Sequence, residues 1–541
     1  MTSYYFMKTR LSIFTILCFS LVCAAPAVAQ QDASKPHFVL LCLAAHPDDE
    51  DGATLAYYKD SFGLKTYTVF LTRGEGGQNE IGPALYKDLA IIRTGEAENA
   101  SAIVGSQPYF LNFPDFGYSK TAEETYKKWG GRDEVLRRLV YVIRALKPDV
   151  IISNHHTWLD DGENHGNHQV AALAALEAFD AAADPRFHPE QFNTPGIAPW
   201  QTKKLFFRMF DYDTSMSKAN NKFIGYSSMP DVAIPIGTMD PVKGERFVEI
   251  ANVALREHKT QGMQYFKSKI DTNERIWYKL MQADENYPTL RTNLFSGLVP
   301  TNTDTGKITL PSEFTMYDYL DAEQPNNFPP PQVKVARGLS IGIVQTYDST
   351  FAQSLALLKI KYTLLDSNTL ADGELAKYST ILVDIRGYGK RPDLAKHYTQ
   401  LLDYVKNGGN LVVFYQKTFD WKPEYSPYPL QITRNRVTYE DVPVTELLQK
   451  NKIFHFPNEI VNGDWDGWTA ERGLYYPAPS KDYLELLSMG DPGEAPLRTG
   501  LLMANYGSGT YWYCSLSLYR QLQLNHEGAF KLFANLVSYN K

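Results

Sequence analysis

A strand-like apolar run is followed at once by a histidine and a cluster of carboxylates. The run covers residues 38–44 and leads into His46-Pro47-Asp48-Asp49-Glu50. Ligands bind outside the carboxyl ends of the strands in open α/β sheets. His46 and Asp49 are three residues apart, so both can turn toward one metal ion. Asp48 points differently from its neighbour and can accept a proton as general base.

Four of the chain's eleven histidines lie in a second segment, residues 154–168, which also follows a strand-like run. A His, Asp, His set with one open position is typical of a catalytic zinc site, where the metal lowers the pKa of a bound water to about 7. His165 and His168 are three apart at the start of a predicted helix. One can bind the metal while the other stabilises an oxyanion. The residues alone leave His155 and His156 open as ligands in place of His168.

Each segment also has a simpler explanation when it is taken alone. His-Pro-Asp can be a plain turn, Asp-Asp-Glu can cap a helix, and histidine-rich loops are often only polar loops. The two segments, however, follow two strands of one predicted sheet. Their joint presence therefore favours a zinc-dependent hydrolase.

These segments resemble the two signature motifs of the PIG-L/LmbE-type de-N-acetylase family, whose members are zinc enzymes that remove acetyl from N-acetylglucosamine-type amides. The first motif is His46-Pro47-Asp48-Asp49-Glu50 and the second is His165-Gly166-Asn167-His168. The similarity extends over residues 36 to about 270. Its further matches are Thr72-Arg73-Gly74-Glu75-Gly76-Gly77, Arg93-Thr94-Gly95-Glu96, Phe113-Pro114-Asp115 and Arg256-Glu257-His258-Lys259-Thr260-Gln261.

The resemblance implies a role for each matching residue. The ligands of Zn2+ would be His46, Asp49 and His168. The general base and the residue that polarises the acetyl carbonyl would be Asp48 and His165. The residues that contact sugar hydroxyls would be Arg93 and Asp115.

One departure from the family pattern concerns the second motif, which usually reads His-Pro-Asp-His. Gly166 and Asn167 fill its middle here, so Asn167 would orient the neighbouring histidine without charge. Two matches have plainer alternatives. Arg93 and Glu96 can form an exposed helical ion pair worth well under 1 kcal/mol. His258 can be a residue that caps or packs, and the sequence favours this.

The elements that must position these residues alternate between strand and helix. Strands are predicted at residues 38–44, 66–71 and 149–154, and helices at 85–104, 136–146 and 169–179. Near-continuous apolar strands separated by helices predict a mostly parallel, Rossmann-like α/β sheet covered on both faces. Residues 204–210 add a strand, and residues 245–281 are predicted as a long helical stretch.

A second α/β pattern starts near residue 339. Strands are predicted at 340–344, 362–365, 380–385, 410–415, 501–505 and 509–516, and helices at 350–358, 392–406 and 527–537. This region resembles a flavodoxin-like, class I glutamine-amidotransferase-like domain. Active members need a Cys on a strand-to-helix elbow. Asp384-Ile385-Arg386-Gly387 lacks one and Cys514 lies inside a strand-like run, so the resemblance implies a non-catalytic domain.

The length of 541 residues indicates more than one domain. We expect a deacetylase domain at 36–295, a linker or crossing segment rich in Pro, Asn and Thr at 296–334, and the amidotransferase-like domain at 335–541. A net charge of −7 argues against nucleic-acid binding. Four cysteines provide no disulfide framework.

The first 29 residues read as a secretory signal peptide. Lys8 and Arg10 precede an apolar run at 11–25, and Ala27-Val28-Ala29 is a small-x-small cleavage site. A membrane anchor is the weaker alternative, because the apolar run is short for a bilayer span. We therefore expect export to a periplasm or to the medium, with no transmembrane anchor in the mature chain.

The expected activity is hydrolysis of an N-acetyl amide on an amino sugar or glycan. The alternatives are a zinc amidase of another N-acyl conjugate and a carbohydrate-binding protein without turnover. Aromatic residues gathered between 419 and 476 can stack on sugars or pack under loops, and their spacing favours packing. Nothing in the sequence indicates an oligomeric state.

Overall fold

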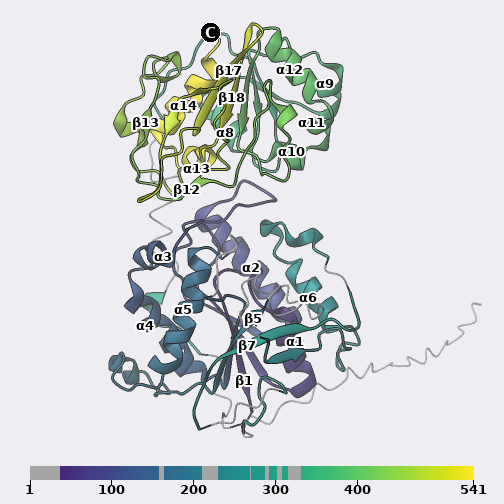
Figure 1. Ribbon diagram of the computed structural model, residues 1–541, viewed down its shortest axis with the longest axis vertical. Helices are drawn as coiled ribbons and strands as arrows, with labels where there is room; N and C mark the ends of the chain where they lie inside the picture. Colours follow the sequence, from purple (N-terminus) through teal and green to yellow (C-terminus); the bar gives the residue numbers. More distant parts are fainter. Residues whose placement is uncertain are drawn as a thin grey trace, which may run out of the picture.

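Two seven-stranded sheets, one in each half of the chain, organise the protein (Figure 1). The structure is a computed structural model that describes residues 37–157, 164–209, 229–267, 270–286, 292–300, 302, 308–314 and 331–541. The predicted signal peptide lies outside these residues. Within them, no helix is both long and apolar enough to cross a bilayer. Cys42 and Cys514 are buried free thiols.

The first sheet has the order β3-β2-β1-β4-β5-β7-β6. Neighbours from β3 to β5 pair in parallel, and β7 pairs antiparallel with both β5 and β6. The prediction of a mostly parallel sheet is confirmed. The strands are β1 Val39–Ala44, β2 Lys65–Phe70, β3 Gln107–Phe110, β4 Val150–Ser153, β5 Lys204–Met209, β6 Val232–Ile234 and β7 Ile276–Ala283.

Helices cover both faces of this sheet because its central strand is apolar on both sides. In β1, Leu41 and Leu43 join the core under α4 and α5, whereas Leu40 and Cys42 join the core under α1 and α6. Figure 1 shows these two pairs of helices on opposite sides of the strands. The helices of this half are α1 Gly52–Phe62, α2 Tyr86–Val104, α3 Ala122–Lys128, α4 Arg132–Leu146, α5 Gly166–Ala181 and α6 Phe247–Leu255.

The predicted long helix over residues 245–281 is wrong. Only α6 is helical there, and the chain then forms two short 3-10 turns before β7. Gly262 adopts a left-handed φ of 85° between the turns, which stops helical propagation. The alternating, aromatic-rich start of β7 at Ile276 and Tyr278 buries one side against the sheet.

The second sheet has the order β15-β17-β18-β11-β10-β8-β9. From β18 to β9 the neighbours are parallel, and β17 and β15 add an antiparallel edge. The strands are β8 Ile341–Val344, β9 Tyr362–Leu364, β10 Thr380–Val383, β11 Asn410–Phe414, β15 Leu484–Glu485, β17 Leu501–Tyr506 and β18 Gly509–Cys514. Two-residue strands outside the sheet include β12 Arg436–Val437 and β14 Gly473–Leu474, which pair with each other.

Helices in this half include α8 Thr350–Leu357, α10 Gly387–Lys390, α13 Leu518–Gln523 and α14 Glu527–Ser538. The helix predicted at 392–406 is broken at His397 into α11 Pro392–Lys396 and α12 Tyr398–Lys406, because His397 leaves helical geometry (φ −113°, ψ 22°). The aromatic cluster packs, as the spacing favoured. Its buried members are Trp421, Tyr425, Trp465, Trp468 and Tyr476.

The two halves are joined by packing as well as by the chain. Leu85, Tyr86 and Leu89, at the start of α2, belong to the hydrophobic core of the C-terminal half. In the crossing segment, Phe314 is buried against the N-terminal half, where its ring meets that of Tyr141. The carboxyl edge of the second sheet therefore lies against loops of the first.

Candidate metal centre

The candidate metal-binding residues come from the carboxyl ends of adjacent parallel strands. His46 and Asp49 follow β1, His155 follows β4, and His168 lies in the first turn of α5. Because β1 and β4 are neighbours, their ends meet at one edge of the sheet. The two motifs, more than 100 residues apart in sequence, therefore meet at the place that the strand pattern predicts.

The three predicted ligands His46, Asp49 and His168 lie in one cluster, in which Asp49 contacts both histidines. Asp49 Oδ2 lies 3.0 Å from His46 Nδ1 and 3.4 Å from His168 Nε2. His168 belongs to both groups of metal-competent atoms in the described part of the chain, one with His46 and His165 and the other with Asp49 and His155. Neither group contains His46, Asp49 and His168 together, and the group of two imidazoles and a carboxylate, a donor set that suits zinc, is Asp49, His155 and His168.

His155 already uses the nitrogen that faces this group. Its Nε2 lies 3.6 Å from Asp49 Oδ2 and accepts a hydrogen bond of 2.9 Å from the Ala45 amide. Binding a metal through Nε2 would take that lone pair from a buried backbone donor, which costs about 1–3 kcal/mol. This contact favours His168 over His155, and the ligand assignment stays a prediction.

The two neighbouring aspartates, Asp48 and Asp49, have pKa values that are shifted in opposite directions. Burial opposes ionisation of Asp49, but His168 and His155 outweigh it and hold the pKa of that carboxyl well below its usual range. Burial and the charge of Asp49 instead raise the pKa of Asp48 to about 7. A carboxylate with a pKa near neutrality is suited to accept and return a proton. Asp49 therefore stays ionised, whereas Asp48 can accept a proton.

Asp48 also has an unusual backbone. Its φ is 91°, in a region that residues other than glycine rarely adopt. Its amide donates to Glu50 Oε2 at 2.9 Å, and Glu50 in turn holds the fully buried His258 at 2.8 Å. Strain of this kind persists where surrounding contacts enforce it, as they do at functional sites. His258 is a packed structural residue, as the sequence favoured.

His165 packs at a tilt within the histidine cluster and keeps an unpaired nitrogen. Its ring lies 3.9 Å from His168 and 5.1 Å from Tyr118, measured between centroids. Burial and the neighbouring His168 hold its pKa well below the ordinary value, so the imidazole is neutral at pH 7 and retains one N–H. Its Nδ1 is buried and meets no hydrogen-bond partner among the described residues. An orphaned polar atom at this place is available to a metal or to a substrate carbonyl.

The structure explains why Gly166 and Asn167 occupy the middle of the second motif. A Cβ on Gly166 would lie 2.3 Å from both Ser119 Oγ and Thr121 O, so no side chain fits. Asn167 Oδ1 accepts hydrogen bonds from the Ser119 and Thr125 hydroxyls, which turns its Nδ2 toward His46 Nε2 at 3.2 Å. Asn167 thus orients a histidine without charge, although that histidine is His46 rather than a sequence neighbour.

Asp115 lies beside the centre, but Arg93 is already engaged by protein atoms. Asp115 Oδ2 is 3.9 Å from His46 Nε2. Arg93 is buried and donates to Gly74 O, to Gln78 O at 3.0 Å and to Thr260 Oγ1 at 3.1 Å. In this arrangement Arg93 fixes the glycine-rich loop, and a contact of Arg93 or Asp115 with sugar hydroxyls remains a prediction.

The alternative of an exposed Arg93–Glu96 ion pair is wrong. Both side chains are buried, and Glu96 accepts from the amide and the hydroxyl of Thr260 at 2.9 and 2.6 Å. Glu75 of the same glycine-rich loop accepts from the Asp115 amide at 2.9 Å. Glu75 and Thr260 belong to motifs noted in the sequence. Nothing in the neighbouring residues, however, indicated that they would bind the Asp115 amide and Glu96.

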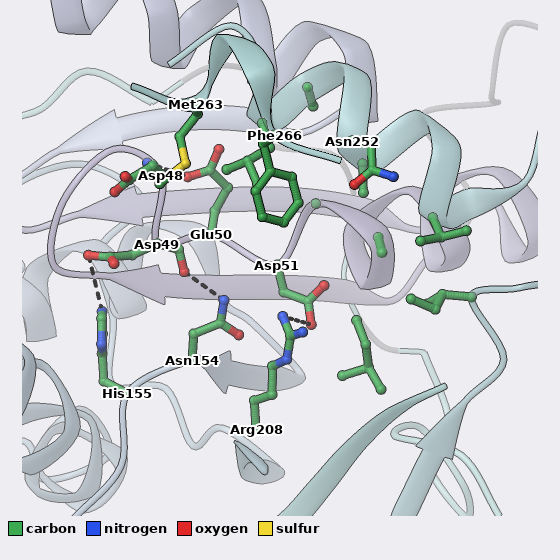
Figure 2. A pocket seen from close by; sticks show the side chains of 18 of the residues that line it. Asp48, Asp49, Glu50, Asp51, Asn154, His155, Arg208, Asn252, Met263 and Phe266 are labelled. Atoms are coloured by element: carbon green, nitrogen blue, oxygen red, sulfur yellow. Dashed lines mark hydrogen bonds and ion pairs between the residues drawn. The ribbon is translucent and has the colours of Figure 1, made fainter. Parts of the chain in front are cut away.

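A cavity of about 670 Å³ opens beside the aspartates. Figure 2 shows contacts from Asp49 to His155 and to Asn154 on one side, with Met263 and Phe266 on the other side of the aspartates. Asn154 Nδ2 donates to the Asp49 carbonyl at 2.7 Å and supports the turn. The apolar wall is formed by Ile236, Val248, Ala251, Leu255, Met263 and Phe266.

Comparisons with known proteins agree with this site. The PIG-L family profile, described as GlcNAc-PI de-N-acetylase, matches residues 41–179. A 1D-myo-inositol 2-acetamido-2-deoxy-alpha-D-glucopyranoside deacetylase of Streptomyces griseus is 28% identical over 318 residues, which cover 52% of this chain and 96% of that protein. A deacetylase of the same description from Saccharopolyspora erythraea is 31% identical over 185 residues, 30% of this chain and 62% of its own length.

Among solved structures, N,N'-diacetylchitobiose deacetylase from Pyrococcus horikoshii aligns with 45% of this chain and 83% of its own, at 21% identity and a TM-score of 0.31. The family profile spans β1 to α5, the elements that carry His46, Asp49 and His168. The N-terminal half of this chain is therefore similar to PIG-L proteins over the elements that carry the candidate metal centre.

Proposed function

We propose that this protein is a zinc-dependent hydrolase that removes an N-acetyl group from an N-acetylglucosamine-type amino sugar or glycan. The observation that supports the proposal is the contact of Asp49 with both His46 and His168, with Asp48 next to Asp49 in the chain. The relative from Streptomyces griseus, matched over 96% of its length, is named as a deacetylase of a 2-acetamido-2-deoxy-glucopyranoside.

The chemistry divides among three parts of the site. Zinc held by His46, Asp49 and His168 supplies a Lewis acid. Asp48 takes a proton from the attacking water as its oxygen adds to the acetyl carbon. An N–H of neutral His165 donates to the oxyanion that forms. Asp48 then returns the proton to the departing nitrogen, so water and amide become acetate and amine.

Residues 36–295 constitute the deacetylase domain in this proposal, with 296–334 as the connection and 335–541 as a non-catalytic, amidotransferase-like domain. Two observations support the last assignment. Arg386 occupies the turn between β10 and α10, where an elbow nucleophile would stand. Cys514 is buried at the end of β18, and burial raises the pKa of its thiol to about 12. Export to a periplasm or the medium is proposed from the N-terminal sequence.

A second candidate is a zinc amidase of a bulkier N-acyl conjugate. The cavity beside Asp48 and Asp49 favours it, because one wall is apolar and the volume exceeds that of an acetyl group. The two candidates share the metal centre and differ in the acyl group that the site accepts. N-acetyl, N-propionyl and N-hexanoyl glucosamine distinguish them.

The decisive assay measures carboxylate and amine released by the full chain after chelation and after zinc is restored. We expect acetate and glucosamine-type amine in equal amounts, loss of both on chelation and recovery with zinc. A preference for the hexanoyl amide would establish the second candidate. Binding of the sugars without hydrolysis of any amide would refute both and leave a carbohydrate-binding protein.

A further inference from the structure

The C-terminal half reaches the rim of the candidate metal centre. Its Lys390 and Arg386 form ion pairs with Glu80 of the glycine-rich loop region, the first at 2.6 Å. Its Arg520 donates to Gly76 O at 2.7 Å. A Cβ on Gly76 would lie 2.3 Å from Asp115 O, so this loop is pressed against the site on its other side. Residues of the C-terminal half are thereby held in a fixed position relative to the histidines.

Arg436 is the residue of that half that stacks toward the histidine cluster. It lies on β12, and its guanidinium carbon is 3.9 Å from the ring centroid of Tyr118. The ring of Tyr118 also neighbours that of His165, at 5.1 Å between centroids and in a tilted arrangement. Tyr118 therefore contacts both Arg436 of the C-terminal half and the residue assigned to the oxyanion.

The guanidinium of Arg436 has hydrogen-bonding capacity to spare. Its one recorded acidic partner among the described residues is Glu471, with Nη1 and Oε2 3.5 Å apart, which is long for a hydrogen bond. A guanidinium carries five N–H donors. Its side chain is 18% exposed, so it is shielded from bulk water and still reachable.

Two nearby lysines contrast with Arg436. Lys120 is neutralised by Asp491 at 2.8 Å and Glu494 at 2.6 Å, and Lys128 pairs with Glu440. These contacts tie the two halves together and consume the lysine charges. Arg436 instead presents a planar cation on the ring of Tyr118, which in turn neighbours His165.

We propose that Arg436 is a specificity-determining residue that binds an anionic group, a carboxylate or a phosphate, on the amino-sugar substrate. The inference rests on the proposed deacetylation and goes beyond it by naming the substrate class. A guanidinium matches both anions through two parallel N–H contacts. The residue lies outside the span of the family profile, so the C-terminal half adds this selectivity to the PIG-L domain.

The test compares neutral N-acetylglucosamine with N-acetylmuramic acid, N-acetylglucosamine 6-phosphate and N-acetylglucosamine 1-phosphate. Binding is measured by calorimetry on the zinc-loaded chain, and kcat/KM is measured from acetate release. We expect at least one anionic sugar to be preferred. Arg436→Met should reduce the ratio of anionic to neutral sugar, in Kd and in kcat/KM, by about 10- to 100-fold. Arg436→Lys should retain part of the preference, because lysine keeps the positive charge but lacks the two parallel N–H donors of the guanidinium.

The matched control is Arg498→Met, which removes an arginine of the same half whose side chain is 57% exposed and pairs with Glu485. It should leave both ratios unchanged. Equal binding of neutral and anionic sugars, or a preference that survives Arg436→Met, would overturn the inference. The better anionic sugar tells carboxylate from phosphate. Anion-selective binding without acetate release would keep Arg436 as an anion site and refute the proposed hydrolysis instead.

Discussion

Replacing Asp48 by asparagine separates proton transfer from metal binding. The carboxylate proposed to bind the metal is that of Asp49, whose contacts with His46 and His168 do not involve Asp48. Asparagine is nearly isosteric with aspartate and tolerates positive φ better than most residues, so the turn at φ 91° survives the change. We therefore expect Asp48→Asn to fold and to bind zinc like the natural chain.

The rate should nevertheless fall sharply. Burial and the charge of Asp49 place the pKa of Asp48 at about 7, close to the pH at which a general base is most effective. An amide cannot accept the proton, and loss of a general base of this kind lowers kcat about 10²- to 10⁴-fold. This corresponds to roughly 3–5 kcal/mol of barrier.

The assay is acetate release, with zinc content measured by elemental analysis on the same samples. Asp133→Asn is the matched control, because it makes the same chemical change on a side chain that is 79% exposed on α4, and it should retain full activity. Full activity of Asp48→Asn with full zinc would remove Asp48 from the mechanism. Loss of zinc together with activity would show that Asp48 serves the metal instead.

Three further predictions concern the metal, the pH dependence of stability and the packing between the halves. His168→Ala should lower zinc content, and undiminished zinc would transfer the ligand role to His155. Burial raises the pKa of Glu124 from 4.5 to about 7, so the folded state binds the proton of this carboxyl more tightly than the unfolded state does. The free energy of unfolding therefore falls as pH rises from about 4.5 to 7. Glu124→Gln should therefore gain about 2–3 kcal/mol at pH 8 and little at pH 4, measured by urea unfolding. Tyr86→Ala removes a ring buried in the C-terminal core and should lower the unfolding free energy by about 3 kcal/mol, and a change below 1 kcal/mol would refute that packing.

The strands that build the site could be predicted because their apolar runs are short, continuous and bounded by polar residues. Each such run must be buried on both faces, which leaves few arrangements besides a parallel sheet between helices. The proposed ligands His46 and Asp49 are three residues apart, so local geometry suffices to bring them together. His168 needed one further step, that β4 is the neighbour of β1.

Partners that lie far apart in sequence escaped prediction. Asn167 is oriented by Ser119 and Thr125, which are 48 and 42 residues earlier in the chain. Residues 276–283 read as helix because their hydrophobicity suits either structure, and pairing with β5 decides for a strand. In both cases tertiary contacts choose between local alternatives of similar energy.

The turn at Arg386 explains why the two halves have to be considered together. Its φ of 56° between β10 and α10 is the sharp strand-to-helix geometry that presents a nucleophile in other α/β enzymes. Here the side chain that the turn presents is a buried arginine, which reaches Gln78 at 3.2 Å and pairs with Glu80. Gln78 in turn accepts from Arg93, whose charge acts on Asp48. The turn thus holds the loop that carries Gln78 and Glu80, which supports a docking role for the C-terminal half.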